Sequence, residues 1–410
     1  MNVLLQEAAT KIEQSQKRDI LIICRVFFPD AGGIQEYVYN RCMQDPTQIV
    51  VLTSSCTGDR AFDQMQSFPV YRWWMPAICS LGAFGSIIKQ ILNIFWSVTL
   101  GIKLYQKYRY SYIEWWHGYD FPALLLLSYL LPVECVIYLH GDDVLCPLKN
   151  PIFHFLFQWT LQRTKVIVCN SKFTQSYVKS NWKLNRHIEI IHPTIRAEKF
   201  GDLSLNSLED LRQQIRDKYQ IPKDGIVILS VGRLVKRKGF DRIIHNLPHL
   251  IAAGLNVYYL ICGRGPMESE LNELANRLDV NSRVILTGYI SDADLAGYYS
   301  ACDIFSMLTF YDSNSRSIEG FGIVYLEAGY FSKPVIASRV GGVEDAVFHG
   351  ETGLLVDPNS SEEILSVLHQ LCVDKELRQR LGFRGKELVN RTIFHRIIYM
   401  NKVTHKIINN

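Results

Sequence analysis

The sequence lacks the features that would place it in several specialised classes of protein. Its 410 residues contain no low-complexity tract, and the formal net charge is only +4. With 48% hydrophobic and 20% charged residues, the composition is that of an ordinary globular protein, which excludes a disordered chain. Because the positive surplus is so small, it gives no argument for a nucleic-acid partner.

The cysteines lack the spacing of a metal site or of a disulfide framework. Ten are scattered singly, with no Cys-x-x-Cys pair and no adjoining His cluster, at positions 24, 42, 56, 79, 135, 146, 169, 262, 302 and 372. This argues against structural zinc and favours a reducing, cytoplasmic compartment. Residues 1–18 are polar and charged, unlike the apolar core of a secretory signal, and we expect a flexible N-terminus there.

Long apolar segments are also scarce. The uncharged stretch between Lys89 and Lys103 has 13 residues, and a second apolar run covers 121–131. Both are shorter than the ~20 residues that a helix needs to cross a bilayer, so neither run predicts a membrane-spanning helix.

Short apolar runs followed by turns and helical stretches are present throughout the chain. The first, at 19–28, ends at Pro29-Asp30 and Gly32-Gly33, after which a helix is predicted. Similar runs lie at 48–52, 112–116, 135–139 and 165–169, and then at 226–231, 256–262, 283–287, 303–307, 334–338 and 353–356. Buried runs that alternate with helices predict an α/β fold with parallel sheets covered on both faces.

The length and the two series of strands predict two Rossmann-like, doubly wound domains. A chain of this size exceeds what one core normally supports, and the polar stretch at 196–208 contains no strand pattern. We predict an N-terminal domain over 19–200, a C-terminal domain over 208–389, and a helix over 390–410 that is a candidate to pack back on the first domain. Ligands in such sheets bind at the carboxyl ends of the strands.

Two glutamates eight residues apart, Glu319 and Glu327, lie around a turn that contains Gly320 and Gly322. If a helix begins near Gly322, Glu327 lies one turn inside it among apolar residues. An unpaired carboxylate there would cost roughly 2–7 kcal/mol, so either a hydroxyl-bearing ligand or a structural Arg or Lys should meet it. The glycines allow close approach of a ligand, and a helix N-terminus offers amides to a phosphate. Together these groups indicate a nucleotide-sugar pocket.

Two cations, Arg233 and Lys238, follow the strand at 226–231 and the turn at Gly232. An Arg fork and a Lys point charge suit a diphosphate and would stabilise the charge that develops on a leaving phosphate. The alternative is a solvated basic loop, because Lys236 and Arg237 lie in the same segment.

The order and spacing of several motifs resemble glycosyltransferase family 4, whose members have the GT-B fold and transfer sugars from nucleotide-sugar donors with retention of configuration. In the second half these motifs are G-R-L-V-K-R-K-G-F-D at 232–241, C-G-R-G-P at 262–266, V-I-L-T-G-Y-I at 284–290, E-G-F-G-I-V-Y-L-E-A at 319–328, K-P-V-I-A-S at 333–338 and G-E-T-G-L-L-V at 350–356. In the first half, F-F-P-D-A-G-G-I at 27–34, H-G-D at 140–142 and N-S-K-F-T at 170–174 resemble the family's acceptor-side domain. The resemblance implies two domains that face a central cleft.

The resemblance also implies roles for individual residues. Arg233 and Lys238 match the family's diphosphate-binding pair, and Glu327 matches the glutamate that holds the ribose hydroxyls. Glu319 matches a catalytic residue that holds the donor sugar. The remaining donor-binding positions are Phe321, Gly322 and Ile323, Gly263 in the C-G-R-G-P motif, and Gly32 and Gly33 in the glycine loop of the first domain. His140 matches a catalytic histidine that points at the donor sugar, although a lone His after a strand is more often structural.

The function implied is transfer of a hexose from a UDP- or GDP-sugar to an acceptor hydroxyl, in glycolipid, polysaccharide or cell-envelope glycan synthesis. No catalytic metal or other cofactor is implied, and the adjacent pair Asp142-Asp143 has poor geometry for Mg²⁺. The polar loop Asp312–Ser317 departs from the family, because many members have Pro-Ser shortly before the first glutamate.

Other functions remain open on the residues alone. A GT-B-type nucleotide-sugar epimerase would share the fold and the diphosphate contacts, and a non-catalytic nucleotide-sugar-binding protein would share the pocket. A dinucleotide oxidoreductase is disfavoured because C-G-R-G-P-M-E lacks the third glycine of G-x-G-x-x-G.

The first half also suggests contact with an anionic membrane and a lipid-linked acceptor. Aromatic residues in R-W-W-M-P-A-I at 72–78 and the apolar stretch to Ile102 accompany the cations Lys89, Lys103, Lys107 and Arg109. This mixture suits the inner face of the cytoplasmic membrane. The alternative is a long hydrophobic helix packed in the core of the domain.

Overall fold

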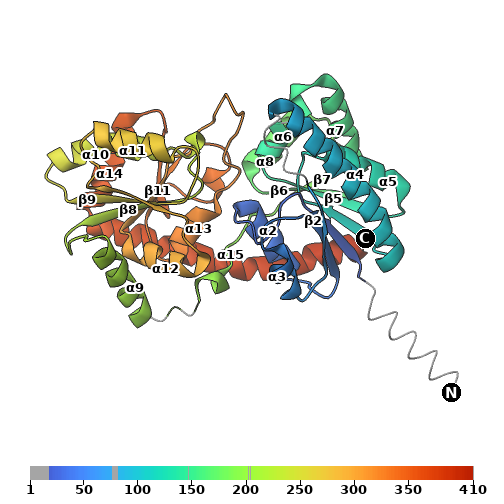
Figure 1. Ribbon diagram of the computed structural model, residues 1–410, viewed down its shortest axis with the longest axis horizontal. Helices are drawn as coiled ribbons and strands as arrows, with labels where there is room; N and C mark the ends of the chain where they lie inside the picture. The colour runs from blue at the N-terminus through green and yellow to red at the C-terminus, as the bar shows by residue number, and fades with distance from the viewer. Residues whose placement is uncertain (1–17, 76–81, 146, 202, 204, 410) are drawn as a thin grey trace, which may run out of the picture. The chain divides into compact units, whose positions relative to one another are not determined.

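A computed structural model describes residues 18–75, 82–145, 147–201, 203 and 205–409 (Figure 1). The predicted flexible N-terminus, apart from Arg18, and the last part of the aromatic run at 72–78 lie outside these residues. The chain divides into two compact units, Met1–His192 and Pro193–Asn410. The segment Pro193–Phe200 therefore belongs to the second unit, which also contains the C-terminal helix.

The first unit contains a seven-stranded parallel sheet with the order β3-β2-β1-β4-β5-β6-β7. The strands are β1 (Ile20–Ile23), β2 (Ile49–Ser54), β3 (Val70–Trp73), β4 (Tyr112–Trp115), β5 (Glu134–Leu139), β6 (Val166–Cys169) and β7 (His187–Ile190). Its helices are α2 (Gly33–Cys42), α3 (Asp59–Gln64), α4 (Gly82–Tyr108), α5 (Phe121–Leu130), α6 (Asp142–Leu145), α7 (Pro151–Arg163) and α8 (Lys172–Asn181). Strands β3 and β7 were not predicted, because most of their residues are only partly buried and lack a continuous apolar run.

The second unit contains a six-stranded parallel sheet with the order β10-β9-β8-β11-β12-β13. All six strands lie where apolar runs predicted them: β8 (Ile226–Val231), β9 (Val257–Cys262), β10 (Val284–Gly288), β11 (Ile304–Met307), β12 (Val335–Ser338) and β13 (Gly353–Val356). Its helices are α9 (Leu205–Lys218), α10 (Phe240–Ala252), α11 (Glu268–Arg277), α12 (Asp292–Ala301), α13 (Ile323–Tyr330), α14 (Ser361–Val373) and α15 (Lys375–Asn409). The packing predicted for 390–410 falls mostly on side chains, from 393 onward, that are outside the description.

Each sheet has one point at which the strand order reverses. In the first sheet this switch point lies between β1 and β4, and in the second between β8 and β11. The loops that leave the carboxyl ends of these central strands diverge to opposite faces, and ligands of open α/β sheets bind in the space between them. The two switch points are therefore where functional side chains are expected.

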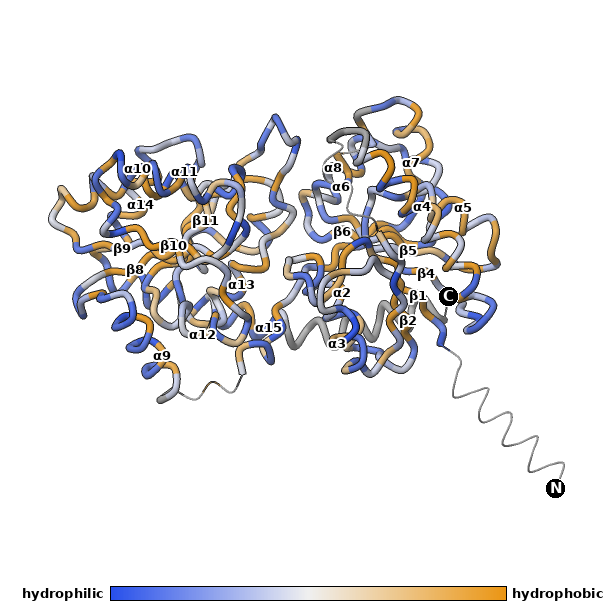
Figure 2. The backbone as a smooth tube through the Cα atoms, in the orientation of Figure 1, coloured by the Kyte–Doolittle hydropathy of each residue, from blue (hydrophilic) through white to orange (hydrophobic). Residues whose placement is uncertain are grey.

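Helix α4 packs in an unusual orientation on the first unit. It buries the small or polar residues Asn93, Ser97 and Gly101, and exposes Ile87, Ile91 and Phe95 by 54–60%. Asn93 accepts a hydrogen bond from the Trp73 indole at 3.1 Å. The helix therefore faces solvent with an apolar stripe. Figure 2 shows hydrophobic residues along α4 as orange segments of the backbone.

The length of this helix corrects the expectation drawn from the short uncharged run. Residues Gly85–Tyr108, 24 in all, are long and apolar enough to cross a membrane by length and composition. Gly101 nevertheless packs closely on α5, since a Cβ at this position would lie 3.2 Å from Leu127, and its carbonyl accepts a hydrogen bond from the Tyr110 hydroxyl at 2.8 Å. These contacts hold α4 against its own unit.

Candidate active site

The loops after β8 and β11 are pressed together at the switch point of the second sheet. A Cβ at Gly239, where φ is +69°, would lie 2.0 Å from the carbonyl oxygen of Leu308. The amide of Phe310 also donates to the carbonyl of Arg237 at 2.9 Å. Because Gly239 directly follows the short 3-10 helix Lys236–Lys238, this backbone contact fixes Lys238 against the segment that leads to Glu319.

Lys238 and Glu319 form an ion pair across this switch point. The Lys238 Nζ lies 2.6 Å from Glu319 Oε2, and Arg237 Nη1 lies 3.2 Å from the same oxygen. Burial alone would raise the pKa of Glu319, but Lys238 and Arg237 outweigh it and lower that pKa to about 2. Glu319 is therefore a carboxylate at any physiological pH.

The predicted phosphate-binding amides lie at the start of helix α13. Gly322 is the N-cap, with φ +91° and no side-chain cap, and a Cβ there would lie 2.4 Å from the Tyr325 ring. Within the described chain, the amides of Gly322 and Ile323 donate no hydrogen bond. Phe321 is buried and precedes the cap. Free amides at the positive end of a helix dipole form a site suited to an anion.

Arg233 and Gly263 follow β8 and β9 at the carboxyl ends of these strands, and they have different roles. The Arg233 side chain is exposed and has no ion pair with any residue that the structure describes, so its guanidinium is available to a ligand. Gly263 has φ +147°, and a Cβ there would lie 1.9 Å from the carbonyl oxygen of Gly232. The glycine of C-G-R-G-P is thus required by backbone packing, whatever it also contributes to donor binding.

Glu327 has partners within the chain. Its Oε1 lies 2.6 Å from Lys199 Nζ, and its Oε2 accepts a hydrogen bond from the Tyr299 hydroxyl at 2.7 Å. The side chains of Glu327 and Lys199 are each only 5% exposed. This is the structural pairing that the sequence left open beside the ribose role, and a ribose would have to share the carboxylate with Lys199 and Tyr299. No described contact joins Glu327 to Glu319 or Lys238.

His140 follows β5 in the first unit and is held tightly. Its Nε2 lies 3.1 Å from the carbonyl oxygen of Trp116, and its backbone amide donates to Asp143 at 2.8 Å. Burial lowers the pKa of His140, so the ring is neutral at pH 7. A neutral ring that donates from Nε2 to the carbonyl keeps Nδ1 as an acceptor, which a sugar hydroxyl could use.

Gly32 and Gly33 start helix α2 at the edge of the first sheet. Gly32 is the N-cap, and its backbone is extended, with φ 167°, a conformation open to any residue. A Cβ at Gly32 would meet only the flexible end of the Gln35 side chain. Conformation therefore does not require glycine at Gly32, and close approach of a ligand stays the predicted reason for it.

Comparison with known proteins then identifies the family. The model for group 1 glycosyl transferases matches residues 212–388, and the model for glycosyltransferase family 4 matches residues 32–199. The chain belongs to glycosyltransferase family 4. The resemblance predicted from the motifs is confirmed, and the protein is a glycosyltransferase.

Relatives and solved structures agree with this assignment. A GDP-mannose-dependent monoacylated alpha-(1-6)-phosphatidylinositol monomannoside mannosyltransferase of Corynebacterium glutamicum is 27% identical over 386 residues, covering 91% of this chain and 93% of the relative. Sucrose-phosphate synthase of Thermosynechococcus elongatus superposes with a TM-score of 0.79 at 19% identity, covering 96% and 100% of the two chains. Anabaena HepE in complex with UDP and glucose gives 0.74 at 19% identity, with 96% and 100% covered. These structures confirm the GT-B fold.

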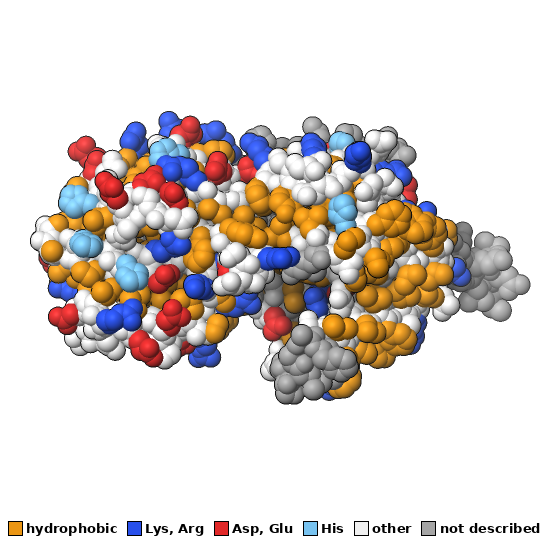
Figure 3. All heavy atoms as spheres, turned by 90° about the horizontal axis from the view of Figure 1, so that it is seen from above, with side chains coloured by type: hydrophobic (Ala, Val, Ile, Leu, Met, Phe, Trp, Pro, Cys, Tyr) orange, Lys and Arg blue, Asp and Glu red, His pale blue; other side chains and the backbone are white. Residues whose placement is uncertain are grey.

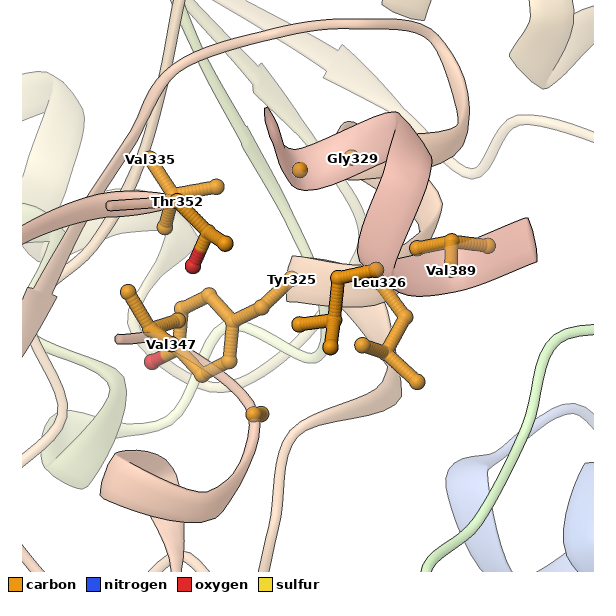
Figure 4. A pocket seen from close by; sticks show the side chains of 10 residues that line it. Tyr325, Leu326, Gly329, Val335, Val347, Thr352 and Val389 are labelled. Atoms are coloured by element: carbon orange, nitrogen blue, oxygen red, sulfur yellow. The ribbon is translucent and has the colours of Figure 1, made fainter. Parts of the chain in front are cut away.

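The apolar pocket in Figure 4 is not the donor site of this glycosyltransferase. It lies beside α13 and is lined by Tyr325, Leu326, Gly329, Val335, Ala346, Val347, Thr352, Gly385, Leu388 and Val389. No charged side chain lines it, so it offers nothing to neutralise a diphosphate.

The structure adds residues that the sequence did not single out. Lys199 and Tyr299 hold Glu327 from positions 128 and 28 residues away, and no local pattern indicates this pairing. The departing loop Asp312–Ser317 forms a compact turn, in which Asp312 accepts hydrogen bonds from the Asn314 amide at 3.0 Å and the Ser315 hydroxyl at 2.7 Å. Among the described residues, no group of three or more His, Cys, Asp or Glu side chains is placed to hold a metal ion.

Proposed function

We propose that this glycosyltransferase transfers a hexose from a UDP- or GDP-sugar to an acceptor hydroxyl, with retention of configuration and without a metal. The observation that supports this most is the ion pair between Lys238 and Glu319 at the β8/β11 switch point, beside a helix whose first amides are free. This arrangement supplies both a cation for a diphosphate and a carboxylate for sugar hydroxyls.

The chemistry assigned to these groups is positioning and electrostatic stabilisation. As the bond between the anomeric carbon and the β-phosphate oxygen breaks, Lys238, Arg233 and the amides of Gly322 and Ile323 stabilise the growing negative charge. The acceptor oxygen attacks the same face of the sugar, forms the new bond to the anomeric carbon, and gives its proton to the departing phosphate. Neutral His140 would hold a sugar hydroxyl and carry no charge into the step.

Binding and product analysis test this function. Saturation at 100 times the Kd stabilises a protein by about 2.7 kcal/mol, so thermal unfolding with UDP, GDP and ADP identifies the base. NMR of the product then reports the anomeric configuration, and a full assay in EDTA tests independence from metal. Inversion, or a loss in EDTA that Mg²⁺ or Mn²⁺ restores, would contradict the mechanism. A new nucleotide sugar formed without an acceptor would favour the epimerase instead.

We propose that the acceptor is lipid-linked. The enzyme would reach it by binding the anionic inner face of the cytoplasmic membrane. Three helices of the first unit expose large apolar side chains: Ile87, Ile91 and Phe95 on α4, Leu126, Tyr129 and Leu130 on α5, and Ile152, Phe155 and Trp159 on α7. Helix α5 packs against both α4 and α7, and the rings of Tyr129 and Trp159 lie 6.0 Å apart, so the exposed side chains come from adjacent helices. Figure 3 shows hydrophobic side chains gathered on this unit. A surface of this kind fits the boundary between headgroups and acyl chains.

The positive charges on α4 also support binding of this surface to an anionic membrane. Lys103 is exposed and lies eight residues after Phe95, beyond the exposed Thr99, in the series that begins with Ile87 and Ile91. Lys107 lies one further turn along and donates to the Tyr71 hydroxyl at 2.8 Å, which fixes its ammonium. Cations beside an apolar stripe are attracted to anionic headgroups.

Sedimentation with phosphatidylglycerol vesicles tests the membrane proposal. Phe95→Asp should release the protein, whereas Phe383→Asp, which changes a similarly exposed ring of the second unit, should not. Absence of binding at low salt, or full binding after Lys103→Glu and Lys107→Glu, would favour a soluble or polysaccharide acceptor.

A further inference from the structure

Three polar side chains at the switch point of the first sheet have no role in the function proposed above. Arg25 follows β1, while His117 and Asp120 follow β4, so they stand on the two sides of the β1/β4 switch point. Asp120 is 1% exposed and His117 is 4% exposed. The Arg25 side chain is 34% exposed, so it lies between the buried Asp120 and solvent.

These groups lie close together, and a hydrogen bond between Asp120 and Asn93 supplies only part of the pairing that the carboxylate needs. Asp120 Oδ2 is 3.8 Å from Arg25 Nε and 4.0 Å from His117 Nε2, and both distances are too long for a hydrogen bond. Asp120 Oδ1 and His117 Nδ1 have no hydrogen-bond partner among the residues that the structure describes. Asp120 even stands at the N-cap of α5 without capping the helix. Buried polar groups are normally paired, so this arrangement calls for a missing partner.

The loop that carries His117 is held in place by its neighbours on both sides. The two carboxylate oxygens of Asp143 accept hydrogen bonds from the amides of Gly118 and His140, each at 2.8 Å. A Cβ at Gly118 would lie 2.9 Å from the carbonyl oxygen of Asp143, so the two loops pack backbone against backbone. The polar atoms are therefore held apart at a spacing that a ligand can use.

The chemistry of the three side chains selects hydroxyl groups. A hydroxyl both donates and accepts, which matches a carboxylate acceptor, an imidazole with one donor and one acceptor, and a guanidinium donor. A phosphate only accepts, and its charge would be repelled by Asp120. We propose that Arg25, His117 and Asp120 form a binding site for adjacent hydroxyls of a sugar or cyclitol ring. This inference rests on the proposed function, in which such a ring belongs either to the transferred hexose or to the acceptor.

The test uses the full-length protein and two kinds of probe. Isothermal calorimetry of UDP-glucose against UDP, and of GDP-mannose against GDP, isolates the contribution of the hexose. Titration of myo-inositol and of methyl α-D-mannopyranoside, followed by NMR of the His117 imidazole in the presence of the nucleotide, reports a polyol from the acceptor side. Calorimetry with each probe is applied to the natural protein, to Asp120→Asn and to His117→Phe, and the NMR measurement to the natural protein and Asp120→Asn, which keep the observed imidazole.

We expect at least a tenfold loss of affinity for one kind of probe in both variants, with the affinity for the free nucleotide unchanged. Loss on the sugar nucleotides assigns the site to the transferred hexose, and loss on the polyols assigns it to the acceptor. Thermal stability separates binding from a structural role: Asp143→Asn, which replaces one of two accepting oxygens by an NH2 group and so breaks a hydrogen bond, should lower the Tm, whereas Asp120→Asn should not.

Unchanged affinity for both kinds of probe in the variants would overturn the site, as would a fall in the Tm of Asp120→Asn equal to that of Asp143→Asn. A failure of the proposed function would give a different result from a failure of the hydroxyl site. In that case the natural protein binds neither UDP nor GDP, while the response of His117 to the polyols still tests the hydroxyl site.

Discussion

Glu319 and Asp120 each follow a central strand at a switch point, yet their surroundings shift their pKa in opposite directions. Lys238 and Arg237 hold the pKa of Glu319 at about 2 against the effect of burial. Burial raises the pKa of Asp120 to about 6, and Arg25 together with a hydrogen bond from Asn93 offsets only part of that shift. At the second switch point the buried carboxylate is therefore fully paired within the chain, whereas the carboxylate at the first is incompletely paired. An ion pair prepares a site for a charged group, and a buried carboxylate with one oxygen lacking a partner prepares one for a hydrogen-bond donor.

The largest effect is expected for a charge that the second unit pairs completely. Glu327→Ala removes the 2.6 Å partner of the buried Lys199 ammonium and leaves it the more distant Asp292 carboxylate at 4.0 Å, which should destabilise the protein by up to about 3–5 kcal/mol in urea unfolding. From the sequence alone this variant is expected to lose turnover with its fold intact, and the Lys199 contact changes the second part of that expectation. Glu351→Ala, at an exposed position of the same unit, is the control. Equal stability of both variants would show that the pair contributes little.

A second experiment tests whether the pair at the β8/β11 switch point serves catalysis. Lys238→Ala should lower turnover by about 10²–10³-fold, because one electrostatic contact to the transition state is lost. Lys236→Ala removes an exposed cation from the same 3-10 helix and should leave turnover near normal. Equal activity of the two variants would mean that the position of Lys238 beside Glu319 has no catalytic consequence.

The pH dependence of the unfolding free energy tests the ion pair that Glu319 makes with Lys238 and Arg237. The folded-state pKa of Glu319 lies below its ordinary value of 4.5. Its contribution of about 3 kcal/mol should therefore be complete above pH 4.5 and be lost as the pH falls toward 2. Glu319→Gln should be less stable than the natural protein at pH 7, with the difference shrinking in acid. A difference that does not change with pH would show that the ion pair is weak in solution.

For Asp120 we expect stability to change with pH in the opposite direction, and we expect the smallest effect of the four variants. Its folded-state pKa is raised from 3.8 to about 6, so ionisation costs stability above pH 6, and that cost disappears as the pH falls through 6 toward 3.8. Asp120→Asn should raise stability at pH 7.5 by at most about 3 kcal/mol and have no such effect near pH 3.8. A destabilised variant at pH 7.5 would mean that the carboxylate already has its partner in the protein.

The sequence predicts most of the fold because the strands are continuous buried runs. Every strand of the second unit was predicted, as were β1, β2, β4, β5 and β6. Strands β3 and β7 were missed because partly exposed edge strands lack that signal. Helix α4 could not be oriented in advance, since it is apolar on more than one face and buries Asn93 and Ser97 while Phe95 is exposed.

Some residues of the candidate site could be predicted from local motifs, whereas others are brought together only by the tertiary fold. Lys238 and Glu319 were predicted because each lies in a recognisable motif, and the structure adds that they touch. Lys199 and Tyr299 could not be predicted as partners of Glu327, because only the tertiary fold brings them together. His117 and Asp120 carry no motif at all. Their interest comes from hydrogen bonds that they do not make, which only coordinates reveal.

The contact between Lys199 and Glu327 also decides where the protein can be divided for study. The short segment before α9 carries Lys199, and Arg196 there is paired with Asp292 at 3.1 Å. A fragment that begins after Phe200 would remove the counter-ion of a glutamate buried in α13. A fragment that begins at Pro193 keeps it. We therefore expect only the longer fragment to be a fair source of donor-binding measurements.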